Sequence, residues 1–205
     1  MKKTILCVVM IVLTISISLG QKSSFSIKAG LSNVTTRITQ DPPDQYVRLG
    51  PSGDRAGIQA GVAYDYKLLK YVRLGVDFQY LMKGYSNQFI EQPPYAEHYL
   101  GLSPTLSFFP FANSQTKYVS CISPGVGFNL NYLIAAKFKW QSHVDRYYWE
   151  TGYTLKLNYQ PGKFGLQIYY SIPFTKYLVY HNHTPPFDES RYYFVTGISF
   201  VYKFF

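Results

Sequence analysis

Hydrophobic and polar residues alternate along most of this chain with a period of two. The clearest run lies in YVRLGVDFQYLMKG, residues 71–84, where the even positions from Val72 to Met82 are apolar or aromatic. The odd positions are small or polar, with Leu81 as the exception. This period predicts a β-strand with two unlike faces. A run of about eleven residues exceeds the average strand of about 5–6 and suits a tilted strand that crosses a membrane.

Seven further segments show the same alternation, so the sequence predicts eight strands in total. The further segments are 25–32, 57–66, 100–108, 121–132, 147–159, 164–172 and 191–205. The connections after the second, fourth and sixth strands are short, whereas the other four are long and rich in turn residues. This layout is typical of an all-β, eight-stranded, antiparallel, up-and-down transmembrane β-barrel with short periplasmic turns and long extracellular loops.

The alternation alone does not say which face meets lipid, because a soluble lipocalin-like barrel also has eight strands around an apolar cavity. A soluble exterior would carry many charged residues, but the polar face here is mostly Gly, Ser, Thr, Gln and Asn. The other face carries bulky Phe, Tyr, Leu and Ile side chains, which would overfill the interior of an eight-stranded barrel. We therefore expect the apolar face to contact outer-membrane lipid.

The few charged residues of the polar face are then expected inside the barrel. An isolated buried charge is costly, so these side chains should pair across the lumen and plug it, which would exclude an open diffusion pore. The predicted charge network consists of Arg73, Asp77, Glu150 and Lys156, with Lys28 and Asp65 as further members.

Composition supports a surface that is only partly in water. Aromatic residues make up 19% of the chain and charged residues only 15%, against about 25% charged residues in typical soluble domains. Aromatic residues also gather near both ends of the predicted strands, as in the girdles of membrane barrels. The net charge of +9 does not predict nucleic-acid binding, because the Lys and Arg residues are scattered.

The first 20 residues have the pattern of a secretory signal peptide. Two lysines precede an apolar run, and the segment ends in a small-x-small cleavage pattern at Gly20. Cleavage would leave residues 21–205 as one barrel domain in the bacterial outer membrane. Cys121 is the one cysteine of that domain, so the fold is not a disulfide scaffold.

Two prolines fall inside predicted strands on either side of the short connection at 112–116. Proline lacks a backbone donor and is unfavourable within a strand. Counting outward from Ser114 at the tip of this hairpin places Pro104 opposite Pro124. We therefore expect the two missing backbone donors to lie at the same level of the ladder, with a local bulge or weakened pairing there.

Four histidines are expected in the long loops: His98, His143, His181 and His183. Barrel enzymes that modify lipids use histidine with Ser, Asp or Glu near the rim, and His98 beside Glu97 is such a pair. No spacing matches a nucleophile motif, and His181 with His183 lacks a fixed third metal ligand. We expect no catalytic residue, cofactor or metal, and keep a rim enzyme and a soluble ligand-binding barrel as alternatives.

The function is expected at the extracellular loops, in a structural, adhesive or secretion-assembly-associated role. Exposed aromatic residues often anchor protein interfaces. The candidate contacts to a protein partner are Tyr46, Phe89, Tyr95, Trp140, Tyr180 and Phe187.

Glycine-punctuated strands recur along the chain in FSIKAGLS, AGIQAGVAYDY, YVRLGVDFQYLMKG, HYLGLSPTLSFF, ISPGVGFNLNY and ISFVYKFF. These segments resemble the small outer-membrane β-barrel family of the Bacteroidetes, with its outer membrane protein beta-barrel domain and PorT-like members. The resemblance implies insertion by the barrel-assembly machinery, which recognises a C-terminal strand that ends in an aromatic residue, and a role in secretion. Here the outward parity falls on Phe200, Tyr202 and Phe204, so Phe205 lies on the other parity.

Overall fold

The computed structural model describes residues 23–41, 52–85, 95–116, 118–136, 144–176, 178–183 and 186–204. Its strands are β1 (Ser23–Asp41), β2 (Ser52–Leu69), β3 (Val72–Tyr85), β4 (Tyr95–Phe108), β5 (Ile122–Ala136), β6 (Val144–Arg146), β7 (Trp149–Tyr159), β8 (Phe164–Pro173), β9 (Leu178–His183) and β10 (Pro186–Lys203). The signal peptide expected at residues 1–20 lies outside the described residues.

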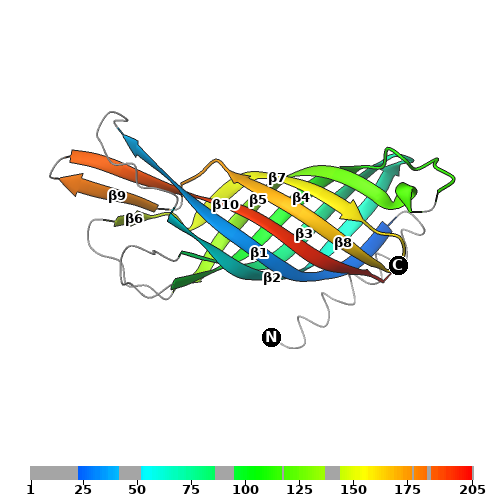
Figure 1. The fold of residues 1–205 in the computed structure, drawn as a ribbon, viewed down its shortest axis with the longest axis horizontal. Helices are drawn as coiled ribbons and strands as arrows, with labels where there is room; N and C mark the ends of the chain where they lie inside the picture. The colour runs from blue at the N-terminus through cyan, green and yellow to red at the C-terminus, as the bar shows by residue number, and fades with distance from the viewer. Residues whose placement is uncertain are drawn as a thin grey trace.

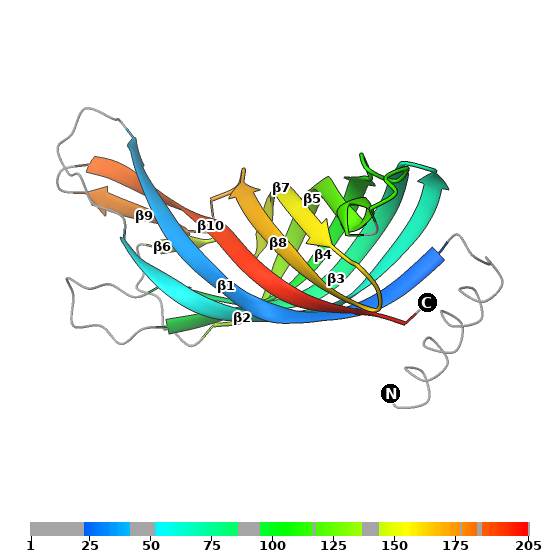
Figure 2. The same cartoon turned by 45° about the vertical axis from the view of Figure 1, so that its right-hand side comes forward.

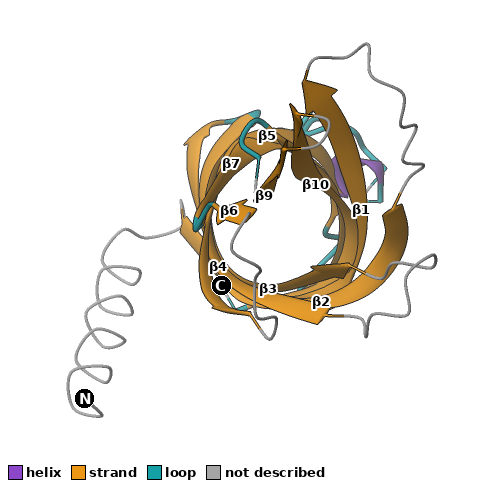
Figure 3. Ribbon diagram, turned by 90° about the vertical axis from the view of Figure 1, so that its left-hand side faces the viewer, coloured by secondary structure: helices purple, strands orange, loops and turns teal. Residues whose placement is uncertain are grey.

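Eight of these strands form a closed antiparallel barrel (Figure 1). Their order around the wall is β1-β2-β3-β4-β5-β7-β8-β10, and β1 pairs with β10 to close the ring. Figure 3 shows this ring along the barrel. The predicted all-β, eight-stranded barrel is therefore confirmed. In the part of the chain described, no helix is both long and apolar enough to span a membrane.

Short connections lie at the end of the barrel that carries the C-terminus, at the right of Figure 1. Lys70 and Tyr71 join β2 to β3, and residues 160–163 join β7 to β8. The connection between β4 and β5 is longer than expected, because it includes the 3-10 helix η2 (Val119–Cys121). Short turns of outer-membrane barrels face the periplasm, so we name this the periplasmic end and the opposite one the extracellular end.

The prolines do not lie opposite each other, so that part of the prediction is wrong, although the β4–β5 pairing is interrupted at Pro104 as expected. The β4–β5 register pairs Thr105 with Gly127, which puts Pro104 level with Phe128, four residues away from Pro124. The centre of the hairpin lies further along the chain than expected, because η2 takes up residues on the β5 side of the turn. The register shift within this pair instead falls between His98 and Tyr99.

Two short strands at the extracellular end were not predicted. Residues 195–202 of β10 pair with β8, and residues 186–191 of β10 pair with β9. β6 pairs with the other edge of β9. The unpaired edge of β10 beyond β8 is a template for another strand, which explains why β9 forms where a loop was expected. We call β6, β9 and the outer ends of β1 (37–41) and β10 (186–191) the crown; it projects at the left of Figure 2.

Side chains of the wall follow the predicted parity. Leu31 and Ile168 point outward and are 62% and 54% exposed, whereas Asp77 and Lys156 point inward and are 4% and 8% exposed. Leu81, the apolar residue at an otherwise small or polar position of β3, also points inward. It packs there with two other buried residues of the lumen. The apolar face is therefore outside, which is the reverse of a soluble lipocalin-like barrel.

Aromatic residues form contacts near both ends of the apolar exterior. At the periplasmic end the ring of Tyr202 lies 5.1 Å from that of Phe164 and 5.0 Å from that of Phe204. Towards the extracellular end the rings of Tyr132 and Trp149 lie 4.6 Å apart. Amphipathic rings at both margins of an apolar belt are the girdles expected of a membrane barrel.

Candidate functional site: the barrel lumen

A charged triad crosses the lumen in its periplasmic half. The Oδ2 atom of Asp77 in β3 forms ion pairs with both Lys28 of β1 and Lys156 of β7. The Lys28 Nζ atom lies 2.6 Å from this oxygen, and all three side chains are buried. Alternation on three separate strands brings them together, because each faces inward. One carboxylate meets two ammonium groups, so the triad carries a formal excess of one positive charge.

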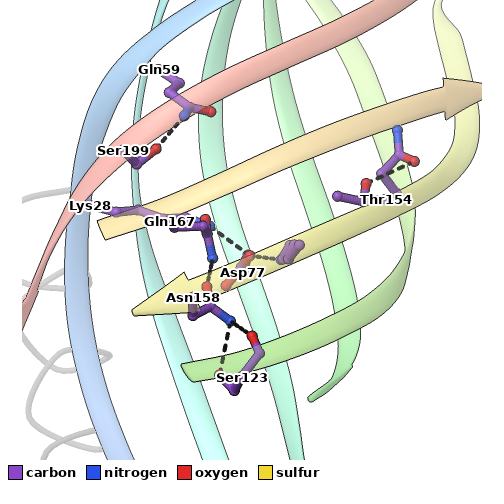
Figure 4. Close-up of polar contacts among 10 residues, drawn as sticks. Lys28, Gln59, Asp77, Ser123, Thr154, Asn158, Gln167 and Ser199 are labelled. Atoms are coloured by element: carbon purple, nitrogen blue, oxygen red, sulfur yellow. Dashed lines mark hydrogen bonds and ion pairs between the residues drawn. The ribbon is translucent and has the colours of Figure 1, made fainter. Parts of the chain in front are cut away.

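A chain of amides extends this triad across further strands (Figure 4). Lys28 Nζ donates to Oε1 of Gln167 at 3.5 Å, and Nε2 of Gln167 donates to Oδ1 of Asn158 at 2.7 Å. Nδ2 of Asn158 then donates to the backbone oxygen of Ser123 at 3.4 Å. The layer thus links β1, β8, β7 and β5 through side chains as well as through the backbone ladder.

A second charged group lies in the extracellular half of the lumen. Lys83 of β3 is ion-paired with Glu150 of β7, and its Nζ atom lies 4.5 Å from the ring centroid of Tyr99. Nη2 of Arg146 lies 2.6 Å from Oε1 of Glu97, and the hydroxyl of Tyr99 donates to the other oxygen, Oε2, at 2.6 Å. Because Arg146 belongs to β6, this ion pair joins the crown to the wall of the barrel.

A buried apolar cluster and a small cavity lie between the two charged groups. Leu81, Tyr99 and Leu133 form a buried apolar cluster. The cavity beside Leu81, which Lys83 and Lys156 line from either side, has a volume of about 10 Å³. That volume holds roughly one water molecule.

The members of the predicted charge network separate into different groups. Asp77 and Lys156 bond to each other, whereas Glu150 pairs with Lys83, which the network did not include. Arg73 forms no close ion pair among the described residues, but it interacts electrostatically with Asp65, so its place in the network stays a prediction. Arg73 is the second residue of β3, opposite Lys67 in the ladder, and its guanidinium stacks 4.2 Å from the ring centroid of Phe109.

The remaining predicted member, Asp65, forms no close ion pair within the described ranges, but it is attracted electrostatically to Arg73, Lys156 and Lys28. Besides Lys83, three residues of the extracellular group were missed: Glu97, Tyr99 and Arg146. Glu97 and Tyr99 precede the segment taken as a strand, and Arg146 lay in a predicted loop. Continuing the alternation backward from the inward-facing Gly101 would have predicted that Tyr99 and Glu97 also face the lumen.

Only three of the six candidate partner contacts lie within the described backbone, and the side chains of these three are not described. Tyr46, Phe89 and Trp140 lie outside the described residues. The other three lie in strands rather than in loops: Tyr95 begins β4, Tyr180 lies in β9 and Phe187 lies in β10.

The histidines do not support a rim enzyme built on His98 and Glu97. His98 lies in β4 and hydrogen-bonds through Nδ1 to the hydroxyl of Tyr80, at 2.5 Å. Glu97 is buried in the lumen on the opposite face of the same strand, so the two side chains point apart. His181 and His183 lie in β9 rather than in a loop, and His143 lies outside the described residues. No cluster of three metal-ligating side chains occurs among the described residues.

Comparison with solved structures agrees with this architecture. The outer membrane protein OprG from Pseudomonas aeruginosa matches with a TM-score of 0.52 and 14% identity, over 90% of this chain and 98% of that one. The fold is that of a small outer-membrane β-barrel. Neisserial surface protein A matches with a TM-score of 0.43 and 14% identity, over 87% of this chain and 98% of that one. No family model and no curated protein sequence matches the chain, so the PorT-like resemblance stays a prediction.

Proposed function

We propose that this protein is an integral outer-membrane barrel with a closed lumen, which acts as a structural or adhesive protein through its extracellular end. The observation that carries the proposal is the cavity of about 10 Å³ at mid-lumen, between the charged groups. A cavity of this volume holds roughly one water molecule and is too small for a solute. In this proposal the chain reaches the membrane after cleavage of residues 1–20 and insertion by the barrel-assembly machinery.

The ion pairs support a permanently closed lumen rather than a gate. Lys28, Asp77 and Lys156 are fixed on three strands of the wall, as are Lys83 and Glu150 on two. Opening a path would separate these buried partners, and a buried charge without its partner is costly. The barrel wall gives these strands no hinge, because every wall strand is paired on both sides.

The crown is the proposed interaction surface. It continues the sheet beyond the apolar belt, and the Arg146–Glu97 ion pair fixes β6 to the wall. A surface held in place loses little conformational entropy when a partner binds. The aromatic residues Tyr46, Phe89, Tyr95, Trp140, Tyr180 and Phe187 are the proposed partner contacts. A secretion-assembly role is supported only by the PorT-like resemblance.

Planar-bilayer recording tests the closed lumen. The refolded protein is expected to give no step conductance, whereas a steady and large conductance would overturn the proposal. A heat-modifiability gel on the same preparation verifies that the barrel is folded, because a folded barrel migrates differently before and after boiling. Absence of current then reports the closed lumen and not absence of protein.

Cysteine labelling tests which end faces outward. In a Cys121→Ser background, Ser190→Cys places a thiol in the outer part of β10. A membrane-impermeant maleimide is expected to label this variant in intact cells and to leave the original chain, with Cys121 at the periplasmic end, unlabelled. The reverse pattern would place the crown in the periplasm and remove the adhesive role.

A further inference from the structure

The periplasmic end of the lumen holds a cavity of about 700 Å³. It extends from the triad of Lys28, Asp77 and Lys156 to the short turns that join the strands. A volume of this size accommodates a small molecule. The triad closes its inner end, so the cavity is a vestibule that opens on one side only.

The lining of this vestibule is strongly basic. Cationic side chains outnumber carboxylates by seven to two, which gives a formal excess of five positive charges. The cationic residues are Lys28, Lys67, Lys70, Arg73, Lys156, Lys163 and Lys203, and the carboxylates are Asp65 and Asp77.

Internal pairing does not neutralise this excess. Asp77 is already shared between two buried lysines of the triad. Neither Arg73 nor Lys203 forms an ion pair with any carboxylate in the described part of the chain. The lining also contains hydroxyl groups that can donate hydrogen bonds, among them those of Ser24 and Ser107.

Like charges enclosed by low-dielectric walls focus the field and attract counter-ions. Phosphate groups fit this lining, because lysine binds them as a point charge and arginine binds them bidentately. We propose that the vestibule binds a small, multivalent, phosphate-bearing anion, with Arg73 and Lys203 near its mouth and the triad at its inner end. This site rests on the closed lumen of the proposed function but not on the extracellular role, and the conductance and binding experiments test the two separately.

Isothermal titration calorimetry with inorganic pyrophosphate tests the site. The folded barrel is kept in a non-ionic, phosphate-free detergent at low salt. Saturable binding is expected, and it should weaken as sodium chloride is added, because the interaction is between charges. The double variant Arg73→Gln/Lys203→Gln is expected to bind at least about tenfold more weakly, since it loses two charge-assisted contacts.

Lys176→Gln is the matched control. Lys176 lies at the extracellular end, with its Nζ atom 6.0 Å from the ring centroid of Tyr147, so its removal should leave pyrophosphate affinity unchanged. Wild-type binding that does not saturate at millimolar pyrophosphate would overturn the proposal. So would a double variant that is folded, as judged by heat-modifiability, and binds like the wild type.

A second measurement locates the anion. Amine acylation followed by mass spectrometry should show Lys203 protected by pyrophosphate and Lys176 unprotected; equal modification with and without pyrophosphate would contradict the site. Adding phosphatidylglycerol to the micelles separates two sources of phosphate. Competition with pyrophosphate would assign the site to lipid headgroups, and absence of competition to free phosphate compounds.

Discussion

Tyr99 donates its hydroxyl hydrogen to Oε2 of Glu97 at 2.6 Å, and both side chains are fully buried. They lie two residues apart on β4, so both face the lumen. The other carboxylate oxygen of Glu97 binds Arg146 of β6. This single carboxylate therefore connects a wall strand to the crown, with a tyrosine hydroxyl and a guanidinium among its partners.

Tyr99→Phe should destabilise the barrel by about 1–3 kcal/mol, because a buried charged acceptor loses one of its donors. The measurement is the free energy of urea-induced unfolding in lipid vesicles. Tyr170→Phe is the control, since Tyr170 points outward and is 39% exposed. Equal unfolding free energies for the two variants would mean that the Tyr99 hydroxyl does not support Glu97.

Asp77→Asn should have a larger effect. It removes the only carboxylate of the triad and leaves Lys28 and Lys156 buried beside each other, at a cost of about 3–5 kcal/mol in unfolding free energy. The double variant Asp77→Asn/Lys156→Gln removes one of the two ammonium groups and should recover part of that loss. A double variant less stable than Asp77→Asn would argue against repulsion between the lysines.

The parity of the wall was predictable from sequence because each strand meets two different environments. Lipid selects apolar residues at one parity, and the lumen selects small or polar ones at the other, so a period of two suffices to orient most of the barrel. Leu81 interrupts the pattern in β3 because the lumen contains an apolar cluster of its own, with Tyr99 and Leu133.

Partner choice across the lumen was not predictable in the same way. Lys83 and Glu150 lie far apart in sequence, and the register of each pair of strands decides whether they meet. The prediction that the prolines lie opposite each other failed for the related reason that one short helix in a turn shifts the register of a hairpin. The crown was missed because β9 forms on an edge that exists only once β10 has extended beyond β8.

Gly197 and Tyr169 form a size-complementary pair inside the barrel. A Cβ added at Gly197 would lie 2.6 Å from Cζ of the Tyr169 ring, well inside van der Waals contact. Gly197→Ala should therefore cost about 1–3 kcal/mol of unfolding free energy by overpacking. Tyr169→Ala added to it should relieve the overlap, so the two changes should be less than additive in a double-mutant cycle. Additive effects would mean that the ring moves aside without cost.

Ile168→Arg tests the orientation of the wall directly. Ile168 points outward at mid-strand in β8, is 54% exposed and lies within the apolar belt. If hydrocarbon surrounds this belt, an arginine there should cost about 2–4 kcal/mol, whereas Thr196→Arg, nearer the extracellular margin, should cost about 0–1 kcal/mol. Unfolding in lipid vesicles measures both variants. An exposed residue on a soluble barrel would tolerate arginine within about 0.5 kcal/mol, so equal and small costs at the two positions would contradict a lipid-facing exterior.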